Sequence, residues 1–431
     1  MTELSVTPIA EGITADAAFE ALAGTTDAAF WLDGGNSLPS YVGVGTTVEL
    51  APPILPGLRR AFTSMRDTDR TVLGLVGWLS YDLGAETVGL EIGQADGMHT
   101  SFMEVRETLA IDPNGTVSLI TRHRSSCKLH ARIREIREQL SRPPDPTLSE
   151  APCGVVDSVR WDDTDNEYAD KIIKCQEHIR AGDAYQLCLT TRITVQASME
   201  PLSVYRRLRQ SNGTSRSGII RIGDTWILST SPEQFLSVNE HRVISTSPIK
   251  GTRPRSDDPV EDECLRIELQ NNLKERAENI MIVDLMRNDL SRVCDTGTVT
   301  VTRLLEVESH PQVHQLVSTV EGQLRADNDT VDALAVCFPA GSMTGAPKKR
   351  AMELLQHLEC GPRGLYAGAF GYIRFDGVAD FSMTIRTIVC TRDTAVIGTG
   401  GGITALSVPQ QEVNEIHLKA RALIAAIEAR A

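Results

Sequence analysis

The sequence predicts an α+β fold built on large antiparallel sheets. Strand-like apolar runs follow one another across short turns in its second half, whereas helical patterns lie apart from them. This grouping is typical of α+β proteins. With 431 residues, 41% hydrophobic and 23% charged, the chain can bury a large core without disulfide or metal staples. The strand-like runs lie at 218–222, 225–230, 242–246, 368–375, 381–390 and 394–400.

The overall charge limits the possible partners. Lys and Arg number 43 against 57 Asp and Glu, which gives a net charge of −14. Such a surface repels phosphate backbones, so we expect no nucleic-acid partner, and an anionic substrate would need a local cationic site. No apolar run approaches the ~18 residues of a membrane span. The nine cysteines include no Cys-x-x-Cys pair, so we expect reduced thiols, no membrane partner and a cytoplasmic location.

A proline-rich segment divides the chain. Residues 141–152 hold four prolines, a density that ends the helical pattern at 128–140 and favours an extended linker. We therefore expect an N-terminal region at 1–140, a linker at 141–160 and a catalytic region at 161–431.

The catalytic region opens with a predicted helix and strand. Tyr168, Ile172, Cys175 and Ile179 recur at helical spacing behind Asp165 as a cap, and Gly182 ends the pattern. Apolar and polar residues then alternate through 184–195, which predicts a half-buried strand. In that strand Gln186 and Cys188 lie on the face opposite the leucines.

The C-terminal segment predicts an amphipathic helix with polar residues beside its apolar stripe. The stripe comprises Val413, Ile416, Ala420, Leu423 and Ile427. Glu412, Glu415 and Lys419 line one flank of it. Two carboxylates one turn apart can hold a hard cation, and the lysine could meet an anion. Spacing alone equally allows an ordinary solvated flank.

Glu275 and Glu278 form a second pair at i, i+3. Leu273, Ala277 and Ile280 lie nearly opposite on the helical wheel. Judged alone, the pair is therefore expected to face water.

Lys250 lies in a turn between Pro248 and Gly251, and Arg253 and Arg255 follow. Most lysines in turns are solvated. A nucleophilic lysine, however, needs a cationic neighbour or desolvation to lose its proton, and the arginines are groups of that kind.

Two glycine-rich segments fail as nucleotide motifs. The segment from Gly341 has Ala346 and Pro347 where a phosphate loop needs glycine and lysine, and Ile403 stands where a dinucleotide motif starting at Gly398 needs its third glycine. ATP and dinucleotide binding therefore have no support.

Together, these segments resemble the chorismate-utilising enzymes, which include anthranilate, aminodeoxychorismate, isochorismate and salicylate synthases. The matching blocks, in order, are GDAYQ, SPEQF, PIKGTRPR, KERAENIMIVDLMRNDLSRV, VHQLVSTVEG, FPAGSMTGAPKKRAMELL, RGLYAGAFGYI, MTIRT and EVNEIHLKARAL. They run from about residue 165 to 430, and FWLDGG and VGWLSYDLG match the family's N-terminal region more loosely. The resemblance implies antiparallel sheets packed as a sandwich with helices outside.

One lysine indicates the branch of the family that the chain resembles most. Component I of aminodeoxychorismate synthase typically reads PIKGT, as here around Lys250, where the other branches have alanine. Isochorismate and salicylate synthases instead carry a lysine, the base that activates water, where this chain has Gln186. Anthranilate synthase component I is the nearest alternative, and a non-catalytic chorismate- or tryptophan-binding sensor is the alternative of another class.

The resemblance also implies a site. Glu278 and Glu415 would bind Mg²⁺, supported through waters by Glu275 and Glu412. Glu233 would be the general acid and Lys250 the nucleophile. The residues implied for substrate binding are Arg386, Tyr366, Lys419, Thr252, His314 and the Gly400, Gly401 and Gly402 loop.

The implied reaction makes 4-amino-4-deoxychorismate, towards 4-aminobenzoate and folate. Lys250 would attack C2 of chorismate as Glu233 protonates the leaving C4 hydroxyl, and ammonia would then enter at C4 and expel the lysine. No cysteine lies in a G-x-C-x-G elbow, so we expect ammonia from a separate glutamine amidotransferase subunit or from free ammonium.

Three positions depart from the family pattern. Cys188 replaces a usual asparagine, Leu406 a usual aspartate, and residues 211–218 a segment associated with a tryptophan pocket. These departures affect pocket detail and tryptophan binding and remove none of the implied catalytic groups.

Overall fold

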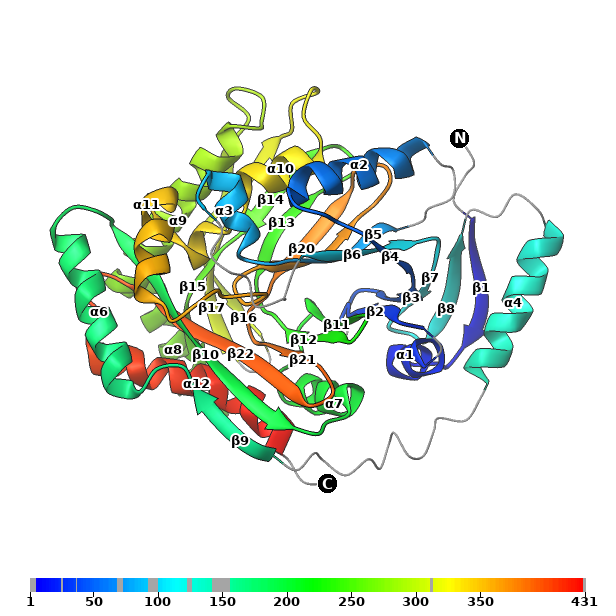
Figure 1. Cartoon of the computed structure of the whole chain (residues 1–431), viewed down its shortest axis with the longest axis horizontal. Helices are drawn as coiled ribbons and strands as arrows, with labels where there is room; N and C mark the ends of the chain where they lie inside the picture. Colours follow the sequence, from blue (N-terminus) through cyan, green and yellow to red (C-terminus); the bar gives the residue numbers. More distant parts are fainter. Residues whose placement is uncertain are drawn as a thin grey trace.

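The computed structural model describes residues 5–24, 26–35, 37–67, 73–91, 100–121, 126–141, 156–310 and 313–428. Within these ranges the chain forms two antiparallel sheets, one of twelve strands and one of ten. Helices lie on the outer sides of the sheets (Figure 1). The predicted α+β sandwich is thus confirmed.

The twelve-stranded sheet combines strands from both halves of the sequence. Its order is β1 (Ser5–Glu11), β8 (Thr116–Thr121), β7 (Glu107–Ile111), β3 (Ser40–Val44), β2 (Ala28–Leu32), β11 (Ser217–Ile222), β12 (Thr225–Thr230), β21 (Thr387–Cys390), β22 (Thr394–Ile403), β10 (Gln186–Ala197) and β18 (Gly345–Ala346), and β9 (Val156–Trp161) also pairs with β10.

The ten-stranded sheet also combines strands from both halves of the sequence. Its order is β15 (Ile249–Pro254), β17 (Val313–Gln323), β14 (Val243–Ser247), β13 (Gln234–Val238), β20 (Ala379–Met383), β19 (Ala369–Ile373), β5 (Gly74–Leu79), β6 (Ser101–Val105) and β4 (Thr46–Val48), and β16 (Thr300–Ser309) pairs with β17.

The inner faces of the two sheets form a shared core. Phe30 and Ile220 of the first sheet pack in one cluster with Trp78, Met103 and Phe370 of the second. The helices are α1 (Ala15–Ala23), α2 (Ile54–Asp67), α3 (Leu83–Val88), α4 (Ser126–Leu140), α6 (Asp165–Arg180), α7 (Pro201–Asn212), α8 (Pro259–Asn271), α9 (Leu273–Ser291), α10 (Thr330–Cys337), the 3₁₀ turn η1 (Gly341–Met343), α11 (Lys348–Leu358) and α12 (Pro409–Glu428). None of the helices in the described ranges has the length and apolar run that a membrane span requires.

The sheets join the two predicted regions of the chain. β2 pairs with β11, and β5 pairs with β19, so strands from before and after the proline-rich segment share both sheets. That segment lies outside the described residues at 142–155. Residues 156–160, placed in the linker by the sequence, belong to β9.

Two predicted helices are confirmed, each with a detail to add. All five residues of the predicted apolar stripe of α12 are buried. In α6, Tyr168, Ile172 and Cys175 are buried as predicted. Its cap is Thr164 rather than Asp165, because the Thr164 hydroxyl and the Glu167 carboxylate form a reciprocal capping box.

Two burial predictions were wrong. β10 is buried on both faces from Gln186 to Thr191, because it lies between β22 and β9 or β18 and is covered by helices as well. In α9 the predicted apolar face is the exposed one: Leu273 is 83% exposed, whereas Glu278 is 8% exposed. The helix is anchored instead by Ile282, Val283 and Met286 further along.

The run predicted as a strand at 381–390 is divided between the sheets. β20 belongs to the ten-stranded sheet and β21 to the twelve-stranded one. Arg386 lies at the crossing and has a left-handed backbone with φ of 49°, a conformation uncommon for a residue other than glycine. This crossing fixes where the Arg386 side chain starts.

Candidate functional site

The glycine-rich part of β22 creates space for the polar side chains of the site. A Cβ atom on Gly402 would overlap the amide of Gln186 and lie 3.5 Å from Nζ of Lys250. A Cβ on Gly401 would lie 3.0 Å from Oε2 of Glu412. Gly400, Gly401 and Gly402 were expected in a loop, but they pair with β10 as part of the strand. Glycine is needed there because side chains from β10, β15 and α12 approach its backbone closely.

Lys250 and Glu233 belong to one electrostatic cluster. Burial raises the pKa of Glu233 to about 7, opposed first by the positive charge of Lys250. Among the described residues, the amine of Lys250 makes no hydrogen bond or ion pair. A carboxyl with this pKa holds its proton near neutral pH, which suits a general acid, and the half-buried Lys250 amine lies beside it without a partner in the described structure.

The hydroxyl of Ser342 completes the surroundings of Glu233. It donates a 2.9 Å hydrogen bond to Oε1 of Glu233. Ser342 lies in η1, in the segment that resembled a phosphate loop. The lysine of that segment, Lys348, is instead paired with Asp289 at 2.7 Å and donates to the carbonyl of Cys337.

The structure brings the four predicted metal-binding glutamates together around one lysine. Burial lowers the pKa of Lys274, but the charges of Glu412, Glu278, Glu275 and Glu415 together raise it above its usual value. Its Nζ lies 3.6 Å from Oε1 of Glu412 and 3.9 Å from Oε1 of Glu278. Burial raises the pKa of Glu278, and Lys250 and Lys274 oppose this.

Lys419 holds the fourth glutamate. Its Nζ lies 2.6 Å from Oε1 of Glu415 and donates a 2.8 Å hydrogen bond to the carbonyl of Gly400. Burial raises the pKa of Glu415, but Lys419 keeps it below its usual range. Lys419 therefore lies next to the glycine strand, and its charge is shared with the Glu415 carboxylate.

Arg386 and Tyr366 lie close together, and Tyr366 contacts β22 at Gly398. Burial lowers the pKa of Arg386, and Tyr366 and the carboxylate of Glu415 oppose this shift. Within the described part of the chain, its guanidinium makes no hydrogen bond or ion pair. Tyr366 packs its ring against Gly398, where a Cβ would overlap it. A half-buried guanidinium without a partner in the described structure is suited to receive an anionic ligand group.

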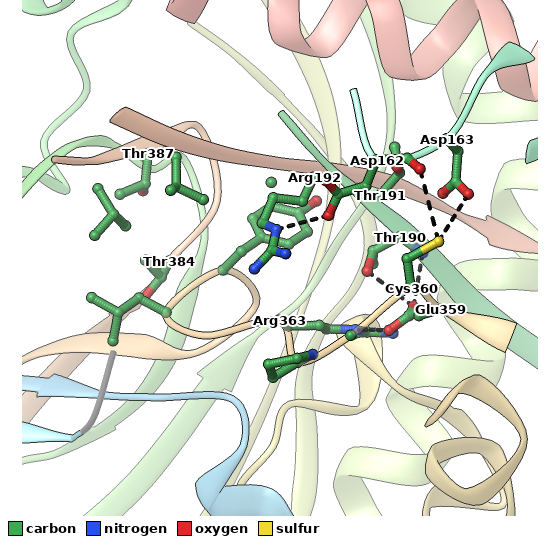
Figure 2. Close-up of a pocket in the computed structure, with 17 residues that line it drawn as sticks. Asp162, Asp163, Thr190, Thr191, Arg192, Glu359, Cys360, Arg363, Thr384 and Thr387 are labelled. Atoms are coloured by element: carbon green, nitrogen blue, oxygen red, sulfur yellow. Dashed lines mark hydrogen bonds and ion pairs between the residues drawn. The ribbon is translucent and has the colours of Figure 1, made fainter. Parts of the chain in front are cut away.

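Tyr366 also lines a small cavity. Figure 2 shows this cavity with Arg363 and Glu359 among the side chains around it. At about 30 Å³ it has room for about one water molecule. In its wall Arg363 is buried and bonds to Glu359 and to the carbonyls of Met343 and Cys188. These bonds join η1, which carries Ser342, to β10 at Cys188.

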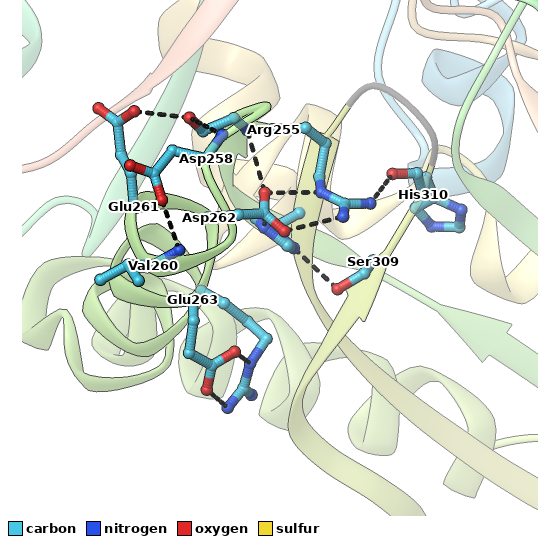
Figure 3. A network of polar contacts seen from close by, with 11 residues as sticks. Arg255, Asp258, Val260, Glu261, Asp262, Glu263, Ser309 and His310 are labelled. Carbon is cyan, nitrogen blue, oxygen red and sulfur yellow. Dashed lines mark hydrogen bonds and ion pairs between the residues drawn. The ribbon is translucent and has the colours of Figure 1, made fainter.

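His314 contacts Ser309 and Asp262, which are labelled in the polar network of Figure 3. Its Nδ1 contacts the hydroxyl of Ser309 at 2.8 Å and its Nε2 contacts Asp262 at 3.0 Å. Asp262 also accepts from Arg255, which holds the pKa of that carboxyl well below its usual range. Both ring nitrogens are therefore already in use, on the side of β17 that faces α8.

The neighbouring residues explain this arrangement. His314 pairs with Arg253 across the ladder, and the next pair is Gln315 with Thr252. Since paired residues share a face and faces alternate, Gln315 rather than His314 lies on the face of Thr252. Arg253 and Arg255 are bound to Glu268 and Asp262. The expected cationic neighbours of Lys250 are thus engaged with α8, and Lys274 and Lys419 are the cations near the glutamates instead.

The sequence argument missed Lys274 and Ser342 as site residues. It also did not predict that the buried amide of Gln186 lies against Gly402. Gln186 is 1% exposed, and its Oε1 has no hydrogen-bond partner in the described structure. Lys274 could have been found from its i, i+4 spacing to Glu278. No sequence signal links Ser342 to Glu233, because the two are distant in the chain.

The donor set of the four glutamates fits Mg²⁺ in its chemistry. Carboxylate oxygens are the ligands this ion takes, and the buried Oε1 of Glu278 has no hydrogen-bond partner in the described structure. The Lys274 ammonium already places a positive charge among them. In the described ranges, however, no three His, Cys, Asp or Glu side chains are yet arranged as a ligand group. Metal binding therefore requires the carboxylates to move closer together.

Comparison with protein families identifies the family of the chain. Residues 29–425 match the model of the chorismate binding enzyme family. The chain belongs to that family.

Eight of its cysteines are free thiols, and Cys153 lies outside the described residues.

The relatives of this chorismate binding enzyme carry two names. Aminodeoxychorismate synthase of Streptomyces pristinaespiralis is 40% identical over 82% of this chain and 51% of its own length. Anthranilate synthase component 1 of Streptomyces coelicolor is 35% identical over 95% of this chain and 86% of its own. The chain thus spans about half the length of the first relative.

A solved structure has the same fold. Anthranilate synthase component I of Streptococcus pneumoniae superimposes with a TM-score of 0.76 at 26% identity, covering 97% of this chain and 92% of that one.

Proposed function

We propose that this chain is the synthase subunit that converts chorismate and ammonia to 4-amino-4-deoxychorismate, towards 4-aminobenzoate and folate. One observation carries the proposal. The Lys250 amine has no hydrogen-bond or ion-pair partner in the described structure, and it lies close enough to Glu233 and Glu278 for its charge to act on both carboxyl groups. Relatives with the aminodeoxychorismate synthase name support it.

Binding of the chorismate dianion would use cationic groups at two places. Arg386 and Tyr366 would take the enolpyruvyl carboxylate, since the Arg386 guanidinium is half-buried and unpaired within the described structure. Mg²⁺ would be held by Glu278 and Glu415, with Glu275 and Glu412 supporting it through waters. When bound, Mg²⁺ would supply positive charge for the ring carboxylate, and Lys419 would add to it.

The chemistry would proceed in two displacements. Glu233 gives its proton to the C4 hydroxyl, which leaves as water while the Lys250 lone pair forms a bond to C2 and the double bond shifts. Ammonia then attacks C4, the double bond shifts back and the bond from C2 to Lys250 breaks. The covalent bond at C2 directs the second nucleophile to C4. The proton released by ammonia can return to Glu233.

Anthranilate synthesis is the second candidate. It is favoured by the relative that matches 95% of this chain, and in this reaction ammonia would be added at C2 instead of C4. Lys250 argues against anthranilate synthesis, because a covalent bond between Lys250 and C2 would prevent ammonia from attacking that carbon.

A product assay separates the two candidates. The chain is incubated with chorismate, Mg²⁺ and ammonium, with and without an added aminodeoxychorismate lyase. We expect 4-amino-4-deoxychorismate alone and 4-aminobenzoate with the lyase. Accumulation of anthranilate would overturn the proposal. Glutamine alone should give no product, because we propose that a separate glutamine amidotransferase subunit supplies the ammonia.

A further inference from the structure

Lys274 occupies the place among the glutamates that a divalent cation would need. Its ammonium lies 3.6 Å from Glu412 and 3.9 Å from Glu278. Oxygens bound to Mg²⁺ lie about 2.0–2.1 Å from the ion, so these carboxylates must close around a smaller space to hold it. An ammonium and a divalent cation cannot share that space.

The contacts of Lys274 are ion pairs without hydrogen bonds. Both distances exceed the 2.7–3.2 Å that is typical of a hydrogen bond from nitrogen. The side chain is 44% exposed, and its flexible stem can carry the ammonium into solvent. Lys274 can therefore leave without breaking a hydrogen bond.

The lysine also links carboxylates of two helices in the metal-free protein. Glu278 lies on α9 and Glu412 on α12, and the Lys274 ammonium lies within 3.9 Å of an oxygen of each.

We propose that Lys274 is an internal counter-cation of the glutamate site, which holds the carboxylates in the metal-free protein and is displaced into solvent when a divalent cation binds. The proposal rests on the proposed metal site of the preceding section. It implies that Lys274 weakens Mg²⁺ binding, because its ion pairs must be given up each time the metal enters.

Calorimetric titration of the metal-free chain with Mg²⁺ alone tests this without any activity measurement. We expect Lys274→Met to bind Mg²⁺ about tenfold more tightly than the parent, since a charge a few ångströms away is removed. Lys274→Arg keeps the charge and should stay within about threefold of the parent. Equal affinity of Lys274→Met and the parent, or equal shifts in both variants, would overturn the proposal.

Chemical labelling of the parent covers the case in which Lys274→Met fails to fold. Mg²⁺ should increase the rate at which an amine-acylating reagent modifies Lys274, measured by mass spectrometry, because the ammonium moves into solvent. Exposed Lys174 on α6 serves as the reference. Unchanged labelling of Lys274 at a saturating Mg²⁺ concentration would overturn the proposal.

The same titrations separate this proposal from the proposed function. If the parent binds Mg²⁺ and only the Lys274 effects are missing, the counter-cation role alone is wrong. If the parent binds no Mg²⁺ while chorismate is still aminated at C4, the metal site is wrong, and the role of Lys274 is overturned with it, whereas the proposed reaction stands.

Discussion

Ser342 and Glu233, 109 positions apart in the chain, share a buried 2.9 Å hydrogen bond. The serine hydroxyl donates to Oε1 of Glu233, and both residues are nearly inaccessible to solvent. The bond stabilises the ionised carboxylate and therefore lowers a pKa that burial has raised to about 7. Ser342 thus adjusts the proton affinity of the proposed general acid.

Loss of this hydrogen bond should shift the pH dependence of catalysis. We expect kcat/KM for chorismate to fall above about pH 7 as Glu233 loses its proton. Ser342→Ala should move this limb to higher pH, because the carboxylate loses a donor. The profile is measured at constant free ammonia. A limb that stays in place or moves to lower pH would contradict the role of Ser342.

Glu233 should also weaken the fold at high pH. Its pKa is raised on folding from 4.5 to about 7, so the folded state binds more protons between these values and stability falls as pH rises through them. Glu233→Gln should therefore stabilise the chain by up to about 3 kcal/mol above pH 7 and by little below about pH 4.5. Urea unfolding at both extremes measures the difference. An equal effect at both pH values would refute the raised pKa.

Removal of the metal, or of its proposed ligands, should stop turnover. Chelation or Glu278→Gln should reduce the rate at least about 100-fold, because the ring carboxylate of chorismate loses its proposed counter-charge. Glu177→Gln, on the exposed side of α6, is the control and should have no effect. Undiminished rates in metal-free buffer would exclude the proposed metal role.

Arg386 should control substrate binding. Arg386→Gln should raise KM for chorismate at least about tenfold, because a buried charge-assisted contact to a carboxylate is lost. Arg392 lies at an exposed position beyond β21. The variant Arg392→Gln is the control and should leave KM for chorismate unchanged. If both variants had the parent KM, Arg386 would have no part in binding chorismate.

Periodicity predicted the elements best where one face of a helix meets the core. The stripe of α12 is one example, because its five apolar residues pack against β22 and neighbouring helices. The same reasoning failed for α9, where the polar face is buried because it lines the site. A prediction from local periodicity takes the apolar face of a helix to be the buried face. This is wrong for a helix whose charged face lines a site.

The site residues came from resemblance rather than from pattern. Glu278, Glu412 and Lys250 were each ambiguous as local motifs and gained meaning only together. The placement of His314 could not be derived, because the face of a residue in β17 depends on register with β15. The spacing of Lys274 to Glu278 is a local signal, but its contact with Glu412 depends on how α9 meets α12.

Amination by a Lys250→Ala variant tests the central claim most directly. The products from chorismate, Mg²⁺ and ammonium are resolved by chromatography, with Lys174→Ala as the control. Formation of 4-amino-4-deoxychorismate should fall at least about 100-fold, because the bond that directs ammonia to C4 is missing. Residual activity should shift towards a 2-amino product, and chorismate binding should remain nearly intact. A Lys250→Ala enzyme that makes 4-amino-4-deoxychorismate at the parent rate would contradict the covalent mechanism.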